Sequence, residues 1–402
     1  MPAKRLDFSK HNLVFDLNEV KRMFSMHTQD CCRHMVKRLL EESMLCDLQH
    51  HLQAQWNQRT ESRSGYRNGY RERTLLTGFG SLELQVPRDR AGQYKPGCFE
   101  RYKRVERTVD EGIRSMFIRG VSTHKVGEVL DALFGFKVSA SYVSSVTREL
   151  DSLVREFENS AIDDDYAFLF IDGIYVRVRY ELQEKRMVLL VAYGIRRDGS
   201  RKILSFRLAK RESRASYQSF LENLKTRGLK GHKLDLIIMD GSPGLWSAVD
   251  EVYADIPHQL CWVHKLRNIG GYCAKRYRKQ CVGEAAQIMY AKTPRKAANR
   301  FRKWRDKWQS KTPRAVRCLE KDFDKLIPFL EFDPEFHKVI RTTNIIERCF
   351  REVRRRLKVM GSFQNSKSCR RIVASLFEYF NIKWTAKINH IKSITKYYQE
   401  AA

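Results

Sequence analysis

Two short apolar runs that each end in Asp-Gly constrain the fold of this chain more than any other feature. The first comprises residues 168–171 and precedes Asp172; the second comprises residues 236–239 and precedes Asp240. A run that is apolar at every position is typical of a strand buried on both faces, because a half-solvated strand alternates. We therefore predict two inner strands of one sheet, each with an acidic side chain at its end.

Strand and helix patterns alternate around these runs. β-prone stretches lie at 165–180, 187–195, 201–208, 234–241 and 258–264. Helical patterns lie at 213–228 and 244–253. In the first of these, four apolar residues recur at i, i+3, i+4 and i+7: Tyr217, Phe220, Leu221 and Leu224. This order predicts an α/β fold class, with a mixed sheet flanked by helices.

The charge of the chain indicates a polyanionic partner. Its 402 residues carry 76 Lys and Arg against 47 Asp and Glu, a formal net charge of +29. Hydrophobic residues make up 42%, which is enough for a core and excludes a wholly disordered basic protein. Such a balance points first to nucleic acid, with a ribosome-associated or simply soluble basic protein as the alternative.

Membrane and disulfide-rich classes do not fit the sequence. No apolar run approaches the roughly 18 residues that a membrane span needs. The first 20 residues contain no apolar signal core, so we expect a cytoplasmic protein. The ten cysteines include no Cys-x-x-Cys pair, which argues against a disulfide framework and against a zinc ribbon.

The N-terminal part of the chain changes in composition and sequence pattern along its length. Residues 1–60 carry helical patterns, and residues 62–107 are rich in Gly, Arg and Tyr. Within the latter, 75–87 predicts a short hairpin, because two β-prone runs flank a Gly-rich turn. Arg67 and Arg71 are interleaved with tyrosines, where they can contact phosphates and bases; a solvated loop is the alternative.

Residues 109–150 are predicted to form three helices. Ser122 and Ser139 are candidate N-caps of the second and third. One face of the second helix collects apolar residues: Val126, Val129, Leu130 and Leu133. Two helices joined by a short Gly-containing turn are typical of a helix-turn-helix that reads the major groove, with a plain helical bundle as the alternative.

The remainder of the chain is predicted to be mainly helical. Between residues 261 and 320 there are 17 Lys and Arg against 3 Asp and Glu, so the region at 265–330 is strongly basic. Two long helices are predicted over 342–395, around a turn at 359–368.

The first of these two helices carries a candidate third acid, Glu347. Its apolar face consists of Ile346, Cys349, Phe350, Val353 and Leu357. Glu347 lies on another stripe, in line with Arg351, Arg354 and Lys358. An ordinary solvated pair between Glu347 and Arg351 is the alternative.

Acids at the ends of buried strands are unusual in so basic a chain, because bare carboxylates repel phosphates. A bound Mg²⁺ would change this repulsion of phosphates into an attraction. Two such ions about 3.5–4 Å apart activate a water or a 3′-hydroxyl and stabilise the leaving oxygen of a phosphoryl displacement. For either aspartate alone, the alternative is a structural role in which it caps the following turn.

Five stretches occur in a fixed order: GYRNGYRERTLLTGFGSLELQVPRDR, DGIYVRVR, MDGSPGL, QLCWVHKLRN, and TTNIIER with RRR and GSF after it. Together they resemble the mutator-type transposases of bacterial insertion sequences, a branch of the DDE transposases. The resemblance runs from residue 62 to 385. Leu260 and Thr343 depart from the Arg and Ser that the family often has, and neither touches the three proposed catalytic acids.

The resemblance implies a ribonuclease H-like catalytic core with an all-helical insertion between the second Asp and the Glu. It implies Asp172, Asp240 and Glu347 as a catalytic triad that holds Mg²⁺, with two ions at the site and Mn²⁺ able to substitute. Gaps of 68 and 107 residues separate the three acids, and the basic helical region fills the second gap.

Cys261 and His264 stand where the family has a Cys-x-x-His signature, and together with Asn344 they are expected to support the active site. From the residues alone they could also form half of a zinc site. Cys273 and Cys281 do not have the usual spacing for its other half.

The resemblance also implies an organisation and a function. We expect an N-terminal helical region (1–60), a DNA-binding region with hairpin and helix-turn-helix (61–155), a first part of the core (160–264), a basic helical insertion (265–335), and C-terminal helices that complete the core (336–402). The expected function is a DNA transposase that binds terminal inverted repeats, cuts a strand to free a 3′-hydroxyl, and joins it to target DNA. Ends joined into a circular intermediate are a further route that the family implies.

Its partners would be double-stranded DNA and further copies of itself, as a homodimer or larger assembly, in the bacterial cytoplasm beside the nucleoid. The expected phosphate contacts, which position rather than specify, are Lys265, Arg267, Arg348, Arg351, Arg354 and Arg355, with Arg67 and Arg71 in the N-terminal region. A non-catalytic, domesticated DNA-binding regulator is the main alternative. An RNA-processing nuclease of the same fold is another, and it would prefer A-form duplexes.

Overall fold

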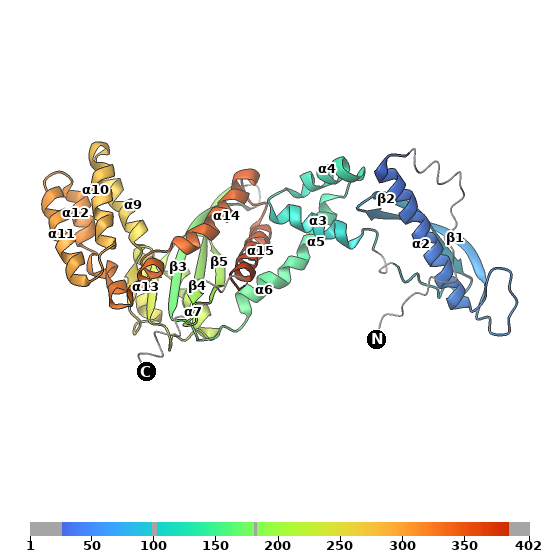
Figure 1. The fold of residues 1–402 in the computed structure, drawn as a ribbon, viewed down its shortest axis with the longest axis horizontal. Helices are drawn as coiled ribbons and strands as arrows, with labels where there is room; N and C mark the ends of the chain where they lie inside the picture. Colours follow the sequence, from blue (N-terminus) through green and yellow to red (C-terminus); the bar gives the residue numbers. More distant parts are fainter. Residues whose placement is uncertain (1–25, 99–102, 181–182, 386–402) are drawn as a thin grey trace. The chain divides into compact units, whose positions relative to one another are not determined.

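The computed structural model describes residues 26–98, 103–180 and 183–385. The chain divides into two compact units, one of residues 1–117 with 122–146 and one of residues 118–121 with 147–402. Figure 1 labels most of the helices and strands of both. Within the three described ranges no helix has the length and apolar character needed to cross a membrane. The finer domain boundaries predicted from the sequence stay predictions.

The first unit packs a helix against a two-stranded hairpin. In α2 (Thr28–Leu52), Met44 is buried in a small core with Leu82, Leu84 and Val86. The hairpin consists of β1 (Arg67–Thr77) and β2 (Gly80–Asp89), which pair in antiparallel fashion. The predicted hairpin is thus confirmed, and it begins at Arg67 rather than near residue 75. Residues 1–25 of the predicted helical region lie outside the described ranges.

Three helices follow the hairpin, as predicted: α3 (Arg107–Ile118), α4 (Thr123–Phe134) and α5 (Ala140–Thr147). The hydroxyl of Ser122 accepts a hydrogen bond from the Lys125 amide, and that of Ser139 accepts one from the Tyr142 amide at 3.1 Å. Both serines therefore cap their helices. Leu133 is 58% exposed, so the buried face of α4 is narrower than predicted.

The second unit is built on a five-stranded mixed sheet with strand order β5-β4-β3-β6-β7. β3 (Phe168–Tyr180), β4 (Gln183–Ile195) and β5 (Arg201–Ala209) are antiparallel neighbours. β6 (Leu236–Met239) and β7 (His258–Leu260) extend the sheet beyond β3 in parallel. The predicted α/β class with a mixed sheet is confirmed. The last strand is shorter than predicted, since it ends at Leu260 rather than at residue 264.

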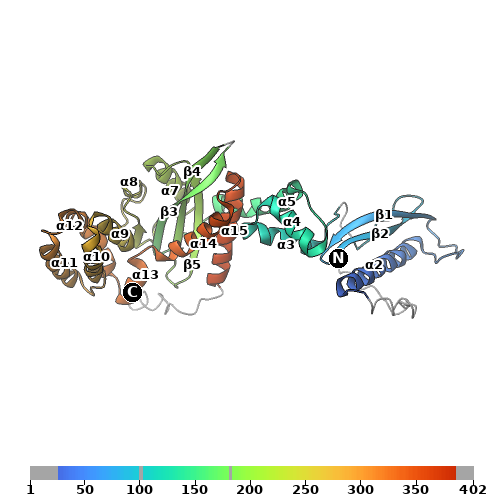
Figure 2. The ribbon, with the colours of Figure 1, turned by 90° about the horizontal axis from the view of Figure 1, so that it is seen from above.

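Helices cover both faces of this sheet. α7 (Arg214–Thr226) and α8 (Pro243–Val252) lie on one side, and α14 (Asn344–Met360) and α15 (Ser366–Thr385) lie on the other (Figure 2). All four apolar residues of the predicted α7 stripe are buried. On the opposite face the ring of Phe206 packs against Phe377 of α15, with centroids 5.6 Å apart. The 3₁₀ turn Arg148–Leu150 and α6 (Asp151–Asn159) precede the sheet.

An all-helical segment separates β7 from α14. It comprises α9 (Trp262–Tyr272), α10 (Lys275–Met289), α11 (Pro294–Trp308) and α12 (Pro313–Glu320), then the 3₁₀ turns Asp324–Leu326 and Pro328–Glu331, and α13 (Pro334–Ile340). Its core is aromatic: the indole of Trp304 donates to the Cys281 carbonyl at 2.9 Å, and that of Trp308 donates to Glu284 at 2.9 Å. These bonds join α11 to α10. The helical character predicted for 265–330 is confirmed.

Two C-terminal helices follow, α14 and α15, around the predicted turn. On α14 the residues Ile346, Cys349, Phe350 and Val353 are buried, as the apolar pattern predicts, whereas Leu357 is only half-buried. The part of the second helix predicted beyond Thr385 lies outside the described residues.

Candidate active site

Asp172 and Asp240 are neighbours on adjacent parallel strands. β3 and β6 pair from Phe168 opposite Leu236 to Ile171 opposite Met239, so the two aspartates are the next residues in register. Paired strands lie about 4.8 Å apart, which brings the two carboxylates together. Asp240 directly follows its strand, as predicted. Asp172 does not end its own, because β3 continues to Tyr180.

The carboxylate of Asp172 is buried and only half satisfied. The residue is 2% exposed, and its Oδ1 accepts a hydrogen bond from the Gly173 amide at 2.8 Å. Its Oδ2 is buried with no hydrogen-bond partner in the described part of the chain. Burial, offset in part by the nearby His264, raises the pKa of Asp172 to about 7. A buried carboxylate oxygen without a donor is costly, and a cation would remove that cost.

Asp240 is only partly buried and has a structural partner. Its Oδ1 accepts a hydrogen bond from the Ser242 amide at 3.0 Å, so the turn-capping alternative accounts for one of its oxygens. Burial raises the pKa of Asp240, and the nearby charge of Glu212 adds to this effect. Glu212 was not predicted as a site residue, because nothing in the sequence links the segment before α7 to the end of β6.

Two tyrosines hold Glu212 in place. The Tyr217 hydroxyl donates to Glu212 Oε1 at 2.6 Å, and the Tyr175 hydroxyl donates to Oε2 at 2.9 Å. Tyr217 was predicted as a core residue of α7, and it is buried. The ring of Tyr217 therefore packs in the core, while its hydroxyl makes a polar contact close to the aspartates.

Glu347 lies in the first turn of α14 and faces two basic side chains of α9. Its Oε1 is 2.5 Å from Arg267 Nη2 and 3.8 Å from His264 Nε2. Neither the predicted stripe on its own helix nor the alternative pair with Arg351 describes these contacts. No three His, Cys, Asp or Glu side chains are gathered as a metal-binding group within the described ranges, and this agrees with Glu347 being engaged by Arg267.

Cys261 and His264 lie beside the acids, at the start of α9. Cys261 Sγ accepts hydrogen bonds from the Thr343 amide at 3.3 Å and from its hydroxyl at 3.4 Å. Burial would raise the pKa of Cys261, but hydrogen bonding to His264 brings it below its usual value. Burial would lower the pKa of His264, but Cys261 and Asp172 raise it to about 9. Both neighbours therefore favour the protonated form of His264.

Thr343, a departure from the family's usual Ser, is a further site contact that was not predicted from the sequence. Its contact with Cys261 fixes the start of α14, and so determines the position at which Glu347 meets α9. The zinc alternative would need further ligands beside Cys261 and His264. Cys281 instead lies 3.8 Å from the Thr312 hydroxyl.

The predicted phosphate contact at Lys265 is wrong in this structure. Lys265 is 5% exposed, its ammonium is paired with Asp322, and it donates to the Cys318 carbonyl at 3.3 Å. The reason is helical periodicity: Trp262, Lys265 and Ile269 share the buried face of α9. Arg267 lies outside this buried face of α9, but its guanidinium is already paired with Glu347.

The other predicted DNA contacts are mostly accessible. Those of α14 are all exposed: Arg348, Arg351, Arg354 and Arg355. In the first unit Arg71 is exposed, whereas Arg67 lies 4.9 Å from the Trp56 ring and donates to the Ala54 carbonyl at 3.4 Å. Asn344 is exposed at the first residue of α14. The contacts of these arginines with DNA stay predictions, and so does the predicted role of Asn344 in supporting the active site.

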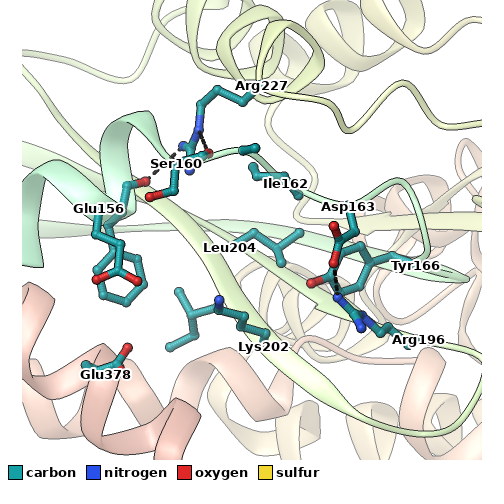
Figure 3. A pocket seen from close by; sticks show the side chains of 13 residues that line it. Glu156, Ser160, Ile162, Asp163, Tyr166, Arg196, Lys202, Leu204, Arg227 and Glu378 are labelled. Atoms are coloured by element: carbon teal, nitrogen blue, oxygen red, sulfur yellow. Dashed lines mark hydrogen bonds and ion pairs between the residues drawn. The ribbon is translucent and has the colours of Figure 1, made fainter.

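A separate hollow borders β5 and contains none of the predicted site residues (Figure 3). Two arginine side chains that line it are bound by other groups of the protein. Arg227 donates to the Ser160 carbonyl at 2.8 Å, and Arg196 lies 2.6 Å from Asp163 Oδ2. These contacts indicate a structural role for this hollow.

The fold and the site together define a basic α/β protein with two aspartates side by side on its inner strands and a glutamate on a covering helix, bordered by cations. The sequence model of the family described as "Transposase, Mutator family" matches residues 9–387. The chain belongs to this family.

Curated relatives agree with this membership. The transposase for insertion sequence element ISRM5 of Rhizobium meliloti is 34% identical over 355 residues, which cover 88% of this chain and 89% of the relative. The transposase for insertion sequence element IS256 in transposon Tn4001 of Staphylococcus aureus is 34% identical over 361 residues, 88% of this chain and 91% of the relative. A chain from the Mos1 strand transfer complex is matched over 42% of this chain and 62% of its own length, at 15% identity and a TM-score of 0.17.

Proposed function

We propose that this transposase cuts and rejoins DNA strands at a metal site formed by Asp172, Asp240 and Glu347. One observation carries the proposal: Asp172 Oδ2 is buried without a partner among the described residues, beside a second aspartate in register on the next strand. Oxygen ligands of this kind suit Mg²⁺ and Mn²⁺. Glu347 would complete the site by turning from Arg267 toward the aspartates.

The arrangement of the sheet supports the ribonuclease H-like core that the sequence resemblance implies. Three antiparallel strands are followed by two parallel ones; in chain order, Asp172 lies within the first strand of the sheet and Asp240 directly follows the fourth. The all-helical segment α9–α13 then lies between Asp240 and Glu347, where the resemblance places an insertion.

When bound, Mg²⁺ would activate the attacking water or 3′-hydroxyl and stabilise the leaving oxygen. The chain's own residues have separate tasks. Asp172 and Asp240 hold their carboxylates at fixed positions, because β3 and β6 are rigid inner strands. Arg267 offsets the negative charge of Glu347, and His264 in its protonated form offsets that of Asp172 and Asp240. The Cys261–Thr343 contact keeps α14 in place relative to α9.

The DNA partner follows from charge and from the relatives' names. The exposed arginines of α14 lie on the helix that carries Glu347, so a strand held by them passes the site. The relatives are named as transposases for insertion sequences, and this favours the same task here over a non-catalytic regulator or an RNA-processing nuclease. Terminal repeats and target DNA would then be the substrates, bound by two or more copies of the chain in the bacterial cytoplasm.

Excision from a plasmid in a bacterial host tests the proposal. The plasmid carries the gene's own flanking repeats, and the junction left by excision is amplified. Asp172→Asn, Asp240→Asn and Glu347→Gln should each abolish excision while end binding persists in a gel-shift assay. Asp255→Asn, an exposed aspartate of the same unit, is the matched control. Full excision by any of the three variants would remove that residue from the site.

A further inference from the structure

A cavity of about 500 Å³ opens next to the proposed active site. α9 contributes Arg267, Asn268, Gly271 and Tyr272 to its wall, and Lys321 and Asp322 close it from the end of α12. Ligand-binding pockets typically measure about 300–1,000 Å³, so the space is large enough for a small ligand. Arg267 links the two sites, because its Nη2 is also 2.5 Å from Glu347 Oε1.

The cavity has an excess of positive charge. Lys265 and Asp322 pair with each other at its base, and the guanidinium of Arg267 is 56% exposed despite its contact with Glu347. Lys321 is exposed at the rim and makes no ion pair within the described ranges. A phosphate entering from the side of Glu347 would therefore meet Arg267 first and Lys321 beyond it.

Tyr272 offers an open aromatic surface in the same cavity. It is 55% exposed, and its ring has no aromatic or cationic partner in the described part of the chain. Stacking of a nucleic-acid base on an aromatic side chain contributes about 1–3 kcal/mol. Bases inside a duplex are already stacked on each other, so only an unpaired base can use this surface.

Gly271 keeps the cavity open between these groups. A Cβ at this position would meet no atom within 4 Å, whereas a Cβ at the preceding Gly270 would lie 3.4 Å from Val282. A side chain added at Gly271 would thus occupy the cavity without displacing the protein. The absence of a side chain, the open ring and the two cations fit one unpaired nucleotide.

We propose that this cavity binds one unpaired nucleotide of the DNA strand next to the cleavage point. Its base stacks on Tyr272 and its phosphate lies between Arg267 and Lys321. The inference rests on the proposed function, since it requires a DNA strand at Glu347. It adds a local melting of the duplex beside the scissile phosphate, which would hold the strand at a fixed distance from the acids.

Photocrosslinking in EDTA tests the cavity separately from the chemistry. The probe is duplex DNA with the gene's terminal repeat and flank, carrying 5-iodouracil in turn at each position around the repeat boundary. Irradiation joins this base to an aromatic side chain in contact with it, and mass spectrometry of the full-length protein's peptides locates the join. Gly271→Leu fills the cavity. Gly283→Leu is the matched control, since Gly283 is exposed on α10, has no atom within 4 Å of its Cβ and does not line the cavity.

The proposal predicts a crosslink at Tyr272 from one boundary position, reduced about tenfold or more by Gly271→Leu, as expected for losing ~1.4 kcal/mol or more. Gly283→Leu should crosslink like the unaltered chain. With Mg²⁺, an abasic site at that position should let Gly271→Leu cut as well as the unaltered chain does. Crosslinks that avoid Tyr272, or that Gly271→Leu leaves unchanged, would overturn the inference. Cleavage that fails while the Tyr272 crosslink persists would instead overturn the proposed chemistry.

Discussion

Arg267 on α9 holds the carboxylate of Glu347 on α14, with Nη2 2.5 Å from Oε1. His264, nearly one helical turn earlier, lies 3.8 Å from the same oxygen. The third acid is therefore bound to cations of the protein, while Asp172 keeps an oxygen without a donor among the described residues. A metal ion at this site has to compete with Arg267 for Glu347.

Removing that competitor should strengthen metal binding. We expect Arg267→Ala to lower the Mn²⁺ concentration for half-maximal thermal stabilisation by about tenfold, which corresponds to ~1.4 kcal/mol. Arg267→Lys keeps the charge and should leave the midpoint near that of the unaltered chain. A midpoint that stays the same or rises in Arg267→Ala would show that Arg267 does not oppose the metal.

Without metal, the titration of Asp172 should make the protein less stable as pH rises from about 4 to 7. The folded-state pKa of Asp172 is raised from 3.8 to about 7. The folded state therefore binds this proton more tightly, so the stabilisation is present at low pH and lost as pH passes the folded pKa. The raised pKa of His264 acts in the same direction, and the lowered pKa of Cys261 acts against it.

The contribution of Asp172 can be isolated by substitution. In EDTA, Asp172→Asn should melt at a higher temperature than the unaltered chain at pH 8, and its melting temperature should fall less between pH 5 and 8. Asp255→Asn, on the surface, should follow the unaltered chain. Parallel pH profiles for Asp172→Asn and the unaltered chain would contradict the assigned burial of this carboxyl.

Much of the second unit could be predicted because its signals are local. The runs before Asp172 and Asp240 are apolar at every position, and only inner strands bury both faces. The stripe that begins at Tyr217 has the period of a helix, and it is buried as expected. The side-by-side position of the two aspartates then follows from parallel pairing of their strands.

Other contacts depend on partners that are distant in the sequence and could not be predicted. Lys265 is of a residue type that often contacts DNA, but its burial depends on Asp322 in a later helical segment. Glu347 was expected to align with cations of its own helix, yet its partner Arg267 comes from α9. In both cases the packing of helices that are distant in the sequence determines the ion-pair partner. The local sequence pattern carries no information about that packing.

The buried pair of Lys265 and Asp322 gives a test of stability. Asp322→Ala leaves an ammonium that is 5% exposed without its carboxylate, which should cost about 3–5 kcal/mol. Lys265→Met replaces the charge with an apolar chain of similar length and should cost less. Thermal melting of the full chain checks the order. A smaller loss for Asp322→Ala than for Lys265→Met would contradict the assigned pairing.

The two arginines of β1 should behave differently on DNA. Arg71 is exposed, so Arg71→Ala should weaken binding to any duplex and reduce the slope of log affinity against log salt by about 1. Arg67 packs over Trp56, so Arg67→Ala should lower the melting temperature as well. Fluorescence anisotropy at several salt concentrations measures the slopes. An unchanged slope for Arg71→Ala would remove it from the phosphate contacts.

Cleavage of end-labelled DNA carrying the gene's own terminal repeats tests the central claim most directly. The purified chain is incubated with this DNA in Mg²⁺ or in EDTA, alongside Asp240→Asn and the control Asp255→Asn. We expect a nick at the repeat boundary in Mg²⁺ for the unaltered chain and the control, and none in EDTA or with Asp240→Asn. Equal nicking in EDTA, or by Asp240→Asn, would contradict a metal site built on these acids.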